Sequence, residues 1–377
     1  MSENKAEIYG FTVYCTKWHI VKELIQHIKE DYGKFSLIVV GGPNPTALPN
    51  ETLQFEGINI VVCGEGEKAF CQIIKMYEKN IFNFETKQIV YGERLNENEF
   101  PMIDRSFVES PEHYGRRILN KPVINLEASR GCLNKCIFCN SVVTDRGKKD
   151  SIVGKSIEKV FQEVMQSQRS GYDMFRFNDD SFTYATYQNG LLDKLRDKNI
   201  HYRIFANAKH LTREVLLKLK ESGCFHISVG IESYNPKNLR IIGKNTRQEE
   251  ICFGINYAQE IGIMIRVYFI VGLPYDNKDN IRKYMEMVAQ EVHFSEYTVY
   301  PLIPYPGSLI WKYPEKFGYT ITNKNFNEYI QIGKGKKTVF ALRHRNFDEN
   351  DIESWVTLSE DILEKYGKVQ TINSKVV

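Results

Sequence analysis

The chain has 377 residues, of which 42% are hydrophobic and 26% are charged, and its formal net charge is +3. This is the composition of a folded globular protein that is long enough for two domains. The small charge, spread over many short clusters, does not indicate a nucleic-acid partner. The longest apolar runs, such as residues 58–63 and 267–273, are too short to cross a bilayer, and the N-terminus has no signal-peptide pattern. We therefore expect a cytoplasmic protein with no membrane and no nucleic-acid partner.

Strand and helix patterns alternate in the first 80 residues. Apolar runs predict strands at residues 8–14, 35–40 and 58–63, and each run is followed by a helical pattern. This order predicts a small α/β domain, residues 1–80, with a parallel sheet covered by helices. Residues 81–121 are mixed and polar, and we expect a linker there.

A longer alternation begins at residue 122. Helical patterns separate six candidate strands, at residues 123–127, 174–177, 202–206, 226–230, 264–270 and 297–302. The first of these helices follows Ser156, a residue type that commonly caps helix N-termini. Six strand–helix repeats predict a partial (β/α)6 barrel of the TIM type over residues 122–320, with the loops after the strands free to form a site. Residues 321–377 are predicted to be a polar C-terminal extension with one amphipathic helix.

Three of the eight cysteines crowd into the loop after the first barrel strand, where residues 129–140 read SRGCLNKCIFCN. Cys132, Cys136 and Cys139 have the spacing Cys-x-x-x-Cys-x-x-Cys, and thiolates are ligands suited to iron–sulfur clusters or zinc. A structural zinc site or an electron-transfer cluster would need a fourth protein ligand, and the next cysteine in the sequence is Cys224. Three thiolates can bind three irons of a [4Fe–4S] cluster and leave the fourth iron open. A zinc loop is the alternative.

This loop resembles the defining motif of the radical S-adenosylmethionine (SAM) superfamily. The resemblance implies that the three cysteines hold the cluster, that SAM binds the open iron, and that one electron cleaves SAM to a 5′-deoxyadenosyl radical. It also implies that Phe138 lies against the adenine. An enzyme of this kind is expected to be oxygen-sensitive and to take its electron from a donor such as flavodoxin or ferredoxin.

Four further segments, in order along the barrel, resemble motifs of the branch of this superfamily that carries an N-terminal cobalamin-binding-like domain. Asp179 and Asp180 stand in an Asp-Asp-x-Phe segment, which the resemblance places near the SAM amino group, with helix capping as the alternative for one of them. Glu232 and Ser233 end a Gly-Ile-Glu-Ser segment, whose polar side chains are expected to reach the ribose or the methionyl part of SAM. Gly272 lies in a Gly-Leu-Pro segment that is expected to contact the adenine through its backbone. The fourth segment, Pro-Tyr-Pro-Gly-Ser, follows the sixth strand and resembles the family's Pro-Tyr-Pro-Gly-Thr turn.

The N-terminal region resembles the later half of a cobalamin-binding domain, with glycine-rich loops at residues 41–43 and 64–67. The family's domain has five strands, whereas three are predicted here, and its early Asp-x-His-x-x-Gly loop has no counterpart. We therefore expect a truncated domain that does not retain cobalamin, either a vestigial docking domain or a sheet completed by another subunit. His19 is expected to be a surface histidine rather than a cobalt ligand.

The leading hypothesis is a radical SAM enzyme that abstracts hydrogen from a small-molecule or peptide substrate. Cobalamin-dependent methyl transfer is the alternative among enzymes, and a non-catalytic protein that binds the cluster and SAM is the alternative of another class. Fold and cluster do not select the substrate or the outcome of the reaction. The basic clusters within residues 334–337 and 343–345 are expected to be solvated, with a phosphate or carboxylate site as the less favoured interpretation.

Overall fold

The computed structural model of the chain describes residues 6–32, 36–81, 87–105, 117–118, 121–140, 152–184, 190–329 and 340–370. The chain divides into two compact units. The first comprises residues 1–95, 137–145 and 303–331, and the second comprises residues 96–136, 146–302 and 332–377. No described helix is both long enough and apolar enough to span a membrane. The basic cluster within residues 334–337 lies outside the described residues.

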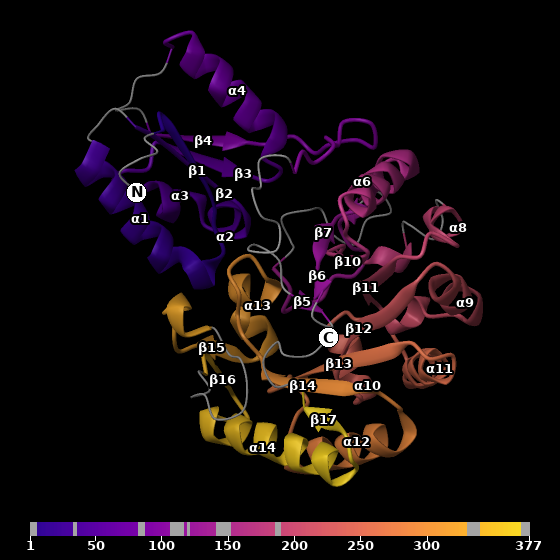
Figure 1. Cartoon of the computed structure of the whole chain (residues 1–377). Coiled ribbons are helices and arrows are strands. Elements are labelled where there is room, and N and C mark those ends of the chain that lie inside the picture. The colour runs from indigo at the N-terminus through magenta and orange to yellow at the C-terminus, as the bar shows by residue number, and fades with distance from the viewer. Residues whose placement is uncertain are drawn as a thin grey trace. The chain divides into compact units, whose positions relative to one another are not determined.

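A four-stranded parallel sheet forms the centre of the first unit (Figure 1). Its strands lie in the order β1 (Ile8–Thr12), β2 (Leu37–Gly41), β3 (Ile60–Cys63) and β4 (Gln88–Tyr91). The helices of this region are α1 (Trp18–Tyr32), α2 (Pro43–Ala47), α3 (Pro49–Leu53) and α4 (Glu67–Glu78). The unit also contains helix α13 (Leu309–Lys312), strand β15 (Tyr319–Ile321) and short 3-10 turns at Cys15–Lys17, Pro314–Phe317 and Phe326–Tyr329.

Both faces of this sheet are apolar and covered by helices. Successive side chains of a strand point to opposite faces, so that Ile38 packs in one cluster with Ile25 of α1, whereas Val39 packs in another with Ile73 of α4. Burial on both faces explains why these strands read as continuous apolar runs rather than as an alternation.

The fourth strand was not predicted. Sequence analysis expected three strands and a linker from residue 81, whereas the structure places β4 beside β3, with Val61 opposite Ile89 in the register. β4 has only four residues, lies at the edge of the sheet and is only partly buried. A short edge strand that no helix follows within residues 92–105 produces no periodic pattern, which is why the sequence did not reveal it.

The second unit is built on a parallel sheet whose order is β17-β14-β13-β12-β11-β10-β7. These strands are β7 (Ile124–Leu126), β10 (Met174–Phe177), β11 (His201–Ala206), β12 (Cys224–Glu232), β13 (Met264–Val271), β14 (Glu296–Pro301) and β17 (Val369–Gln370). The helices are α6 (Ile157–Arg169), α8 (Leu191–Leu195), α9 (Arg213–Glu221), α10 (Pro236–Ile241), α11 (Gln248–Glu260), α12 (Lys278–Glu291) and α14 (Glu349–Lys365). The six predicted strands and their order are confirmed, and the fold is a partial (β/α)6 barrel to which β17 adds a short edge strand.

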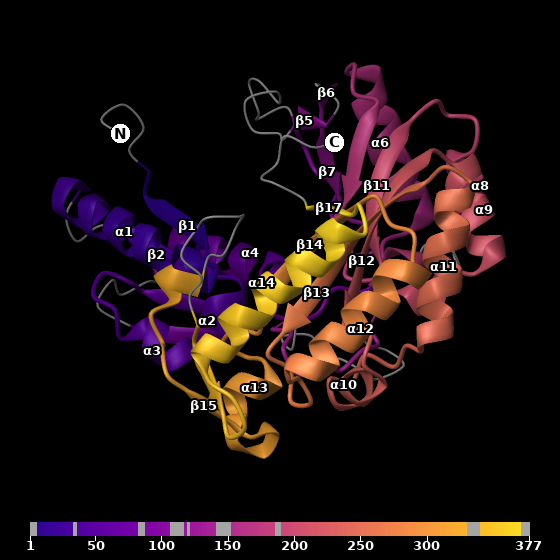
Figure 2. The ribbon, with the colours of Figure 1, turned by 90° about the horizontal axis from the view of Figure 1, so that it is seen from below.

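Helices cover one face of the barrel sheet. Figure 2 shows α12 and α14 side by side along it, and α14 also packs on β14. The Ser156 side chain accepts a hydrogen bond from the Lys159 N–H and caps α6, as the sequence predicted. A 3-10 turn at Ala208–His210 and the short strand β16 (Leu342–His344) also belong to this unit.

Two short antiparallel pairs precede and follow β7. β5 (Arg117–Ile118) pairs with β6 (Lys121–Pro122), and β8 (Ser129–Arg130) pairs with β9 (Val153–Gly154). The second pair joins the two ends of the segment that contains Cys132, Cys136 and Cys139. It therefore anchors the start of the cysteine loop, at Cys132, beside the carboxyl end of β7.

Candidate active site

The cysteine loop starts directly after β8. Gly131 has a φ of 100°, a left-handed conformation that glycine adopts without strain. Cys132 is buried, and its Sγ accepts a hydrogen bond of 3.5 Å from the Asn134 N–H, whereas Cys136 is partly exposed. Both cysteines belong to the second unit.

Phe138 and Cys139 belong to the first unit, where both side chains are partly exposed. Within that unit the carbonyl of Ile137 accepts a hydrogen bond of 3.0 Å from the N–H of Ile310 in α13. In the described part of the chain, no three His, Cys, Asp or Glu side chains form a group that could hold a metal ion. The three-cysteine cluster site therefore stays a prediction, and it rests on the donor chemistry, since three thiolates suit an iron–sulfur cluster.

Sequence analysis missed Lys244, which lies beside two of these cysteines. Its Nζ is 2.9 Å from Oε1 of Glu232, and both side chains are nearly buried, with 11% exposed. Burial works to lower the pKa of Lys244, but Glu232, Cys136 and Cys132 outweigh burial and raise it. The site therefore presents an ammonium and a carboxylate next to the cysteine loop. Lys244 stands in an irregular segment, and no sequence pattern distinguishes it from a surface lysine.

The backbone at the end of β12 is shaped to hold this ion pair. The register with β13 shifts between Gly230 and Glu232, and Glu232 has a φ of 63°, which is uncommon for a residue with a side chain. A Cβ added to Gly230 would lie 2.2 Å from Oε1 of Glu232 and 2.9 Å from Nζ of Lys244. Glycine at position 230 is therefore required for the pair to fit. Ser233, the next residue, is buried, and its Oγ accepts a hydrogen bond from Asn235 N–H.

The two aspartates after β10 have different surroundings. Asp179 is buried, and its carboxylate accepts hydrogen bonds from the N–H of Ala128 and the hydroxyl of Ser129. Burial raises the pKa of Asp179 to about 7, against the opposing effect of these hydrogen bonds. Asp179 thus holds the chain at the start of the cysteine loop, whereas Asp180 is exposed. Of the two, Asp180 is the one whose side chain the structure leaves accessible to a ligand.

Gly272 lies in a turn that a buried carboxylate organises. The Gly272 and Leu273 N–H groups both donate to Oδ2 of Asp276, whose Oδ1 accepts from the side-chain amide of Asn238. Burial raises the pKa of Asp276 to about 7. Gly272 has a φ of 91°, and a Cβ added there would lie 3.1 Å from Ile352 of α14. Both constraints explain why the Gly-Leu-Pro turn begins with glycine.

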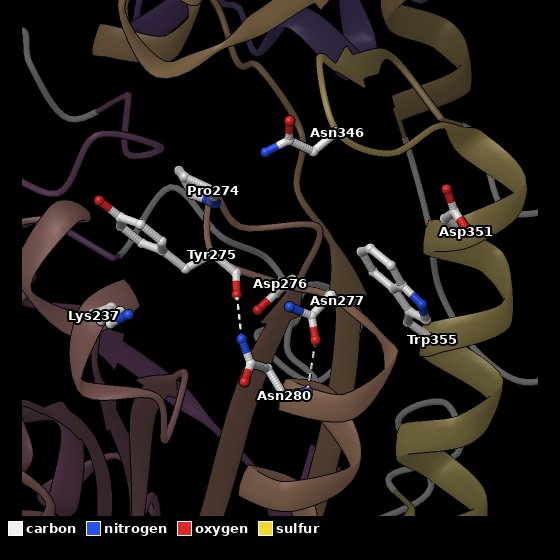
Figure 3. A pocket seen from close by; sticks show the side chains of 9 residues that line it. All are labelled: Lys237, Pro274, Tyr275, Asp276, Asn277, Asn280, Asn346, Asp351 and Trp355. Atoms are coloured by element: carbon white, nitrogen blue, oxygen red, sulfur yellow. Dashed lines mark hydrogen bonds between the residues drawn. The ribbon is translucent and has the colours of Figure 1, made fainter.

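A pocket of about 340 Å³ opens beside this turn (Figure 3). Pro274 and Tyr275 of the turn, Lys237 of α10 and Trp355 of α14 contribute to its walls. Asn280 also lines the pocket, and Figure 3 shows its side-chain amide, which donates to the carbonyl of Tyr275. Neither the cysteines nor Lys244 line this pocket, so it is separate from the cysteine loop.

The first unit offers a second ligand site at the carboxyl ends of its strands, where open parallel sheets bind ligands. Gly42, after β2, has a φ of 98°, and a Cβ added there would lie 3.0 Å from the backbone N of Val13. Asn44 is buried, and within the described ranges its Oδ1 has no hydrogen-bond partner. Gly66, at the start of α4, has open space where a Cβ would lie. The open space at Gly66 and the buried Oδ1 of Asn44 fit a ligand at this edge, whereas the missing Cβ of Gly42 makes room for Val13 of the same unit.

Two family models match the chain. Residues 126–288 match the model of the radical SAM superfamily, and residues 1–74 match the model of the B12 binding domain. The chain belongs to the radical SAM superfamily, in the branch with an N-terminal cobalamin-binding-like domain, as the motifs predicted. The radical SAM family implies a [4Fe–4S] cluster and SAM.

Similar proteins include cobalamin-dependent enzymes. The chain is 25% identical to a protein of Pyrococcus horikoshii described as an uncharacterized methyltransferase, over 90% of this chain and 74% of that one. The radical SAM methyltransferase TsrM from Kitasatospora setae, solved with cobalamin and a [4Fe–4S] cluster, has a TM-score of 0.67 at 15% identity and covers 97% of this chain and 79% of its own. The cobalamin-dependent SAM radical enzyme OxsB has a TM-score of 0.59 at 20% identity, over 82% of this chain and 47% of its own. This chain covers only 63% and 60% of the lengths of two further curated relatives.

The match of the B12 binding domain opposes the expectation that cobalamin does not bind. That expectation depended on a count of three strands and on the missing Asp-x-His-x-x-Gly loop, and the count was too low, since the sheet has four parallel strands with both faces covered. The short strand β4 lies in a segment without periodicity, so the sequence patterns underestimate the size of the sheet. The comparisons also favour the alternative function, methyl transfer, over the leading hypothesis of hydrogen abstraction.

Proposed function

We propose that the chain is a cobalamin-dependent radical SAM methyltransferase that acts on a small molecule. The observation that carries the proposal is the match of residues 1–74 to a B12 binding domain, on the same chain as a radical SAM barrel with a three-cysteine loop. When bound, the cluster supplies the electron that cleaves SAM, and the cobalamin supplies a carrier for a methyl group. Cys132, Cys136 and Cys139 would hold the cluster, and the glycine-rich loops after β2 and β3 would hold the cobalamin.

The ion pair of Glu232 and Lys244 is proposed to bind the amino-acid end of SAM. That end is a zwitterion, with an ammonium group and a carboxylate. Glu232 and Lys244 lie 2.9 Å apart in a nearly buried site. When the ligand binds, the carboxylate of Glu232 can pair with its ammonium group, and the ammonium of Lys244 can pair with its carboxylate. Asp180, which follows β10, and Ser233, which follows β12, would add polar contacts. An external one-electron donor is part of the proposal.

Corrinoid retention tests the first half of this proposal. Protein purified without oxygen and incubated with hydroxocobalamin should retain about one corrinoid per chain after desalting. Gly66→Phe places a ring in the open space at the start of α4 and should abolish retention without affecting folding. Glu78→Phe is the matched control, because it puts the same ring at the exposed far end of the same helix. If neither the wild type nor Glu78→Phe retained corrinoid, the proposed role of cobalamin would be refuted.

Hydrogen abstraction by the 5′-deoxyadenosyl radical is the second candidate. The observation that favours it is the similarity of fold to OxsB, which is described as a cobalamin-dependent SAM radical enzyme. The products separate the two candidates. Methyl transfer consumes SAM to S-adenosylhomocysteine, whereas hydrogen abstraction alone yields 5′-deoxyadenosine and no S-adenosylhomocysteine.

A further inference from the structure

Helix α10 ends in a Schellman cap, the hydrogen-bonded turn that often closes a helix at a glycine. The N–H of Lys244 donates to the carbonyl of Leu239, which lies five residues earlier. The N–H of Gly243 donates to the carbonyl of Arg240. Gly243 has a φ of 71°, the left-handed conformation that this cap requires and that glycine adopts without strain. The cap alone therefore accounts for a glycine at position 243.

A second constraint at Gly243 comes from the cysteine loop. A Cβ added to Gly243 would lie 2.9 Å from the carbonyl oxygen of Lys135 and 3.9 Å from the backbone N of Cys136. At 2.9 Å the added atom would overlap the carbonyl, so that either the cap or the loop backbone would have to move. Gly243, Lys135 and Cys136 all belong to the second unit. The backbone that leads into Cys136 therefore packs directly on the cap of α10.

Helix α14 ends in a cap of the same kind that lies in open space. The N–H of Lys368 donates to the carbonyl of Leu363, and the N–H of Gly367 donates to the carbonyl of Glu364. Gly367 has a φ of 72°, and an added Cβ would meet none of the described residues within 4 Å, its chain neighbours aside. Gly243 and Gly367 thus share conformation and hydrogen bonds, and they differ in what they pack against. Contact with another segment is therefore not part of the capping role.

Helix α10 is held firmly enough for its cap to act as a fixed support. Asn238, in the middle of the helix, is fully buried. Its side-chain amide donates to Oδ1 of Asp276, and its Oδ1 accepts a hydrogen bond from the N–H of Tyr275. The cysteine loop lacks such internal support, because residues 131–136 contain no helix or strand. A loop of ligands without secondary structure depends on its surroundings for a precise geometry.

The same cap fixes a positive charge beside the loop. Lys244, the residue after Gly243, has its Nζ 2.9 Å from Oε1 of Glu232. Burial lowers the pKa of Lys244, but Glu232 and the thiolates of Cys136 and Cys132 outweigh burial and raise it, so the side chain stays an ammonium. A nearby positive charge stabilises the reduced, more negative state of an iron–sulfur cluster. The distance between cap and loop therefore affects the reduction potential.

We propose that Gly243 is a positioning residue for the iron–sulfur cluster, and that it holds the loop between Cys132 and Cys136 in the conformation that binds iron. The missing side chain lets the cap of α10 support the loop backbone at Lys135, next to one of the ligands. Contacts that orient metal ligands typically change metal affinity by about 10–100-fold when they are removed. The proposal rests on the cluster that is part of the proposed function, and it adds the element that orients two of the three cysteines.

Matched substitutions at the two caps test this role. Gly243→Ala and Gly367→Ala impose the same backbone strain, so both should lower the thermal unfolding midpoint by a similar amount. Gly243→Ala should also displace the cysteine loop. Its reconstituted cluster should lose iron to a chelator roughly tenfold faster than the wild type or more. Its reduced cluster should show a changed electron paramagnetic resonance spectrum and a lower midpoint potential, because the loop lies farther from Lys244. Gly367→Ala should match the wild type in these three measurements.

Asparagine at the same two positions separates the contact from the strain. Asn adopts the left-handed conformation at helix ends more readily than Ala does, and it still carries a Cβ. If Gly243→Ala does not fold, Gly243→Asn compared with Gly367→Asn therefore carries the same prediction.

Wild-type iron retention, spectrum and potential in the Gly243 variants would overturn the proposal, and so would an equal loss of iron in the Gly367 variants. The measurements use neither SAM nor cobalamin, so either result would leave methyl transfer standing. A wild type that binds no cluster would overturn the proposed function together with the role of Gly243.

Discussion

The two parallel sheets of this chain use their faces in opposite ways. In the first unit β3 is buried at every residue, and both faces of its sheet pack against helices. In the second unit β13 and β14 alternate strictly between buried and partly exposed residues. The first sheet therefore presents a ligand with the loops at its strand ends, whereas one face of the barrel sheet is not fully buried. Two parallel sheets of one chain thus differ in the surfaces that a ligand can reach.

Removing the cysteines should have the largest effect, because it removes the ligands of the proposed cluster and leaves the glycine-rich loops after β2 and β3 unchanged. The wild type should carry about four irons and four sulfides per chain after anaerobic reconstitution. Changing Cys132, Cys136 and Cys139 together to Ala should abolish both the cluster and SAM cleavage, measured by iron and sulfide content and by product analysis. Corrinoid retention should persist. Cys71→Ala, at an exposed cysteine of α4, is the control and should change none of these. A triple variant that still binds a cluster would contradict the assignment.

Breaking the ion pair beside the cysteine loop should come next in size. Lys244→Met leaves the carboxylate of Glu232 nearly buried without its partner, and such a change costs about 3–5 kcal/mol in the free energy of unfolding. The double variant Glu232→Met/Lys244→Met should be destabilised by much less than the sum of the two single variants, since no unpaired charge remains. Urea unfolding of all three variants measures the coupling. Additive losses would show that the two side chains act independently.

Asp180→Ala should weaken SAM binding and leave the cluster and the fold unchanged. The side chain is exposed, so its removal costs little stability, and the loss of a polar contact with the SAM ammonium should reduce affinity by about 1–3 kcal/mol. Equilibrium dialysis with the reconstituted protein measures this. Asp361→Ala, an exposed aspartate of α14, is the matched control. Equal SAM affinity in both variants would show that Asp180 does not contact the ammonium group of SAM.

The smallest effect concerns pH and the Gly-Leu-Pro turn. Burial raises the pKa of Asp276 to about 7 from an ordinary value of 3.8. Between these values the folded chain keeps the proton that the unfolded chain has lost, so the free energy of unfolding should fall as pH rises from 5 to 7. One such group contributes about 1 kcal/mol per pH unit. Asp276→Asn, which does not titrate, should lose that part of the slope in denaturation series at pH 5, 6 and 7. A slope equal to that of the wild type would contradict the assignment.

Sequence patterns revealed those features that depend on local chemistry. The six barrel strands, the cap at Ser156 and the cysteine spacing follow from periodicity and residue type, and the structure contains the strands and the cap as predicted. Tertiary features were not visible. Lys244 contacts Glu232 only in the folded chain, because the two residues are twelve positions apart and join through tertiary structure. Strand β4 forms only by pairing with β3. Arg203 stands between Tyr202 and Ile204 in β11, and this alternation in the sequence indicates that its side chain points to the other face of the sheet.

The central claim is that this chain cleaves one SAM molecule at its cluster and, with the help of cobalamin, takes a methyl group from another, which leaves as S-adenosylhomocysteine. Reconstituted protein, reduced without oxygen, is incubated with SAM in the presence and absence of hydroxocobalamin, and the products are quantified by mass spectrometry. We predict that SAM is consumed only when the cluster is present, and that S-adenosylhomocysteine forms only when cobalamin is also bound. No consumption of SAM by protein with a complete cluster and bound corrinoid would contradict the account.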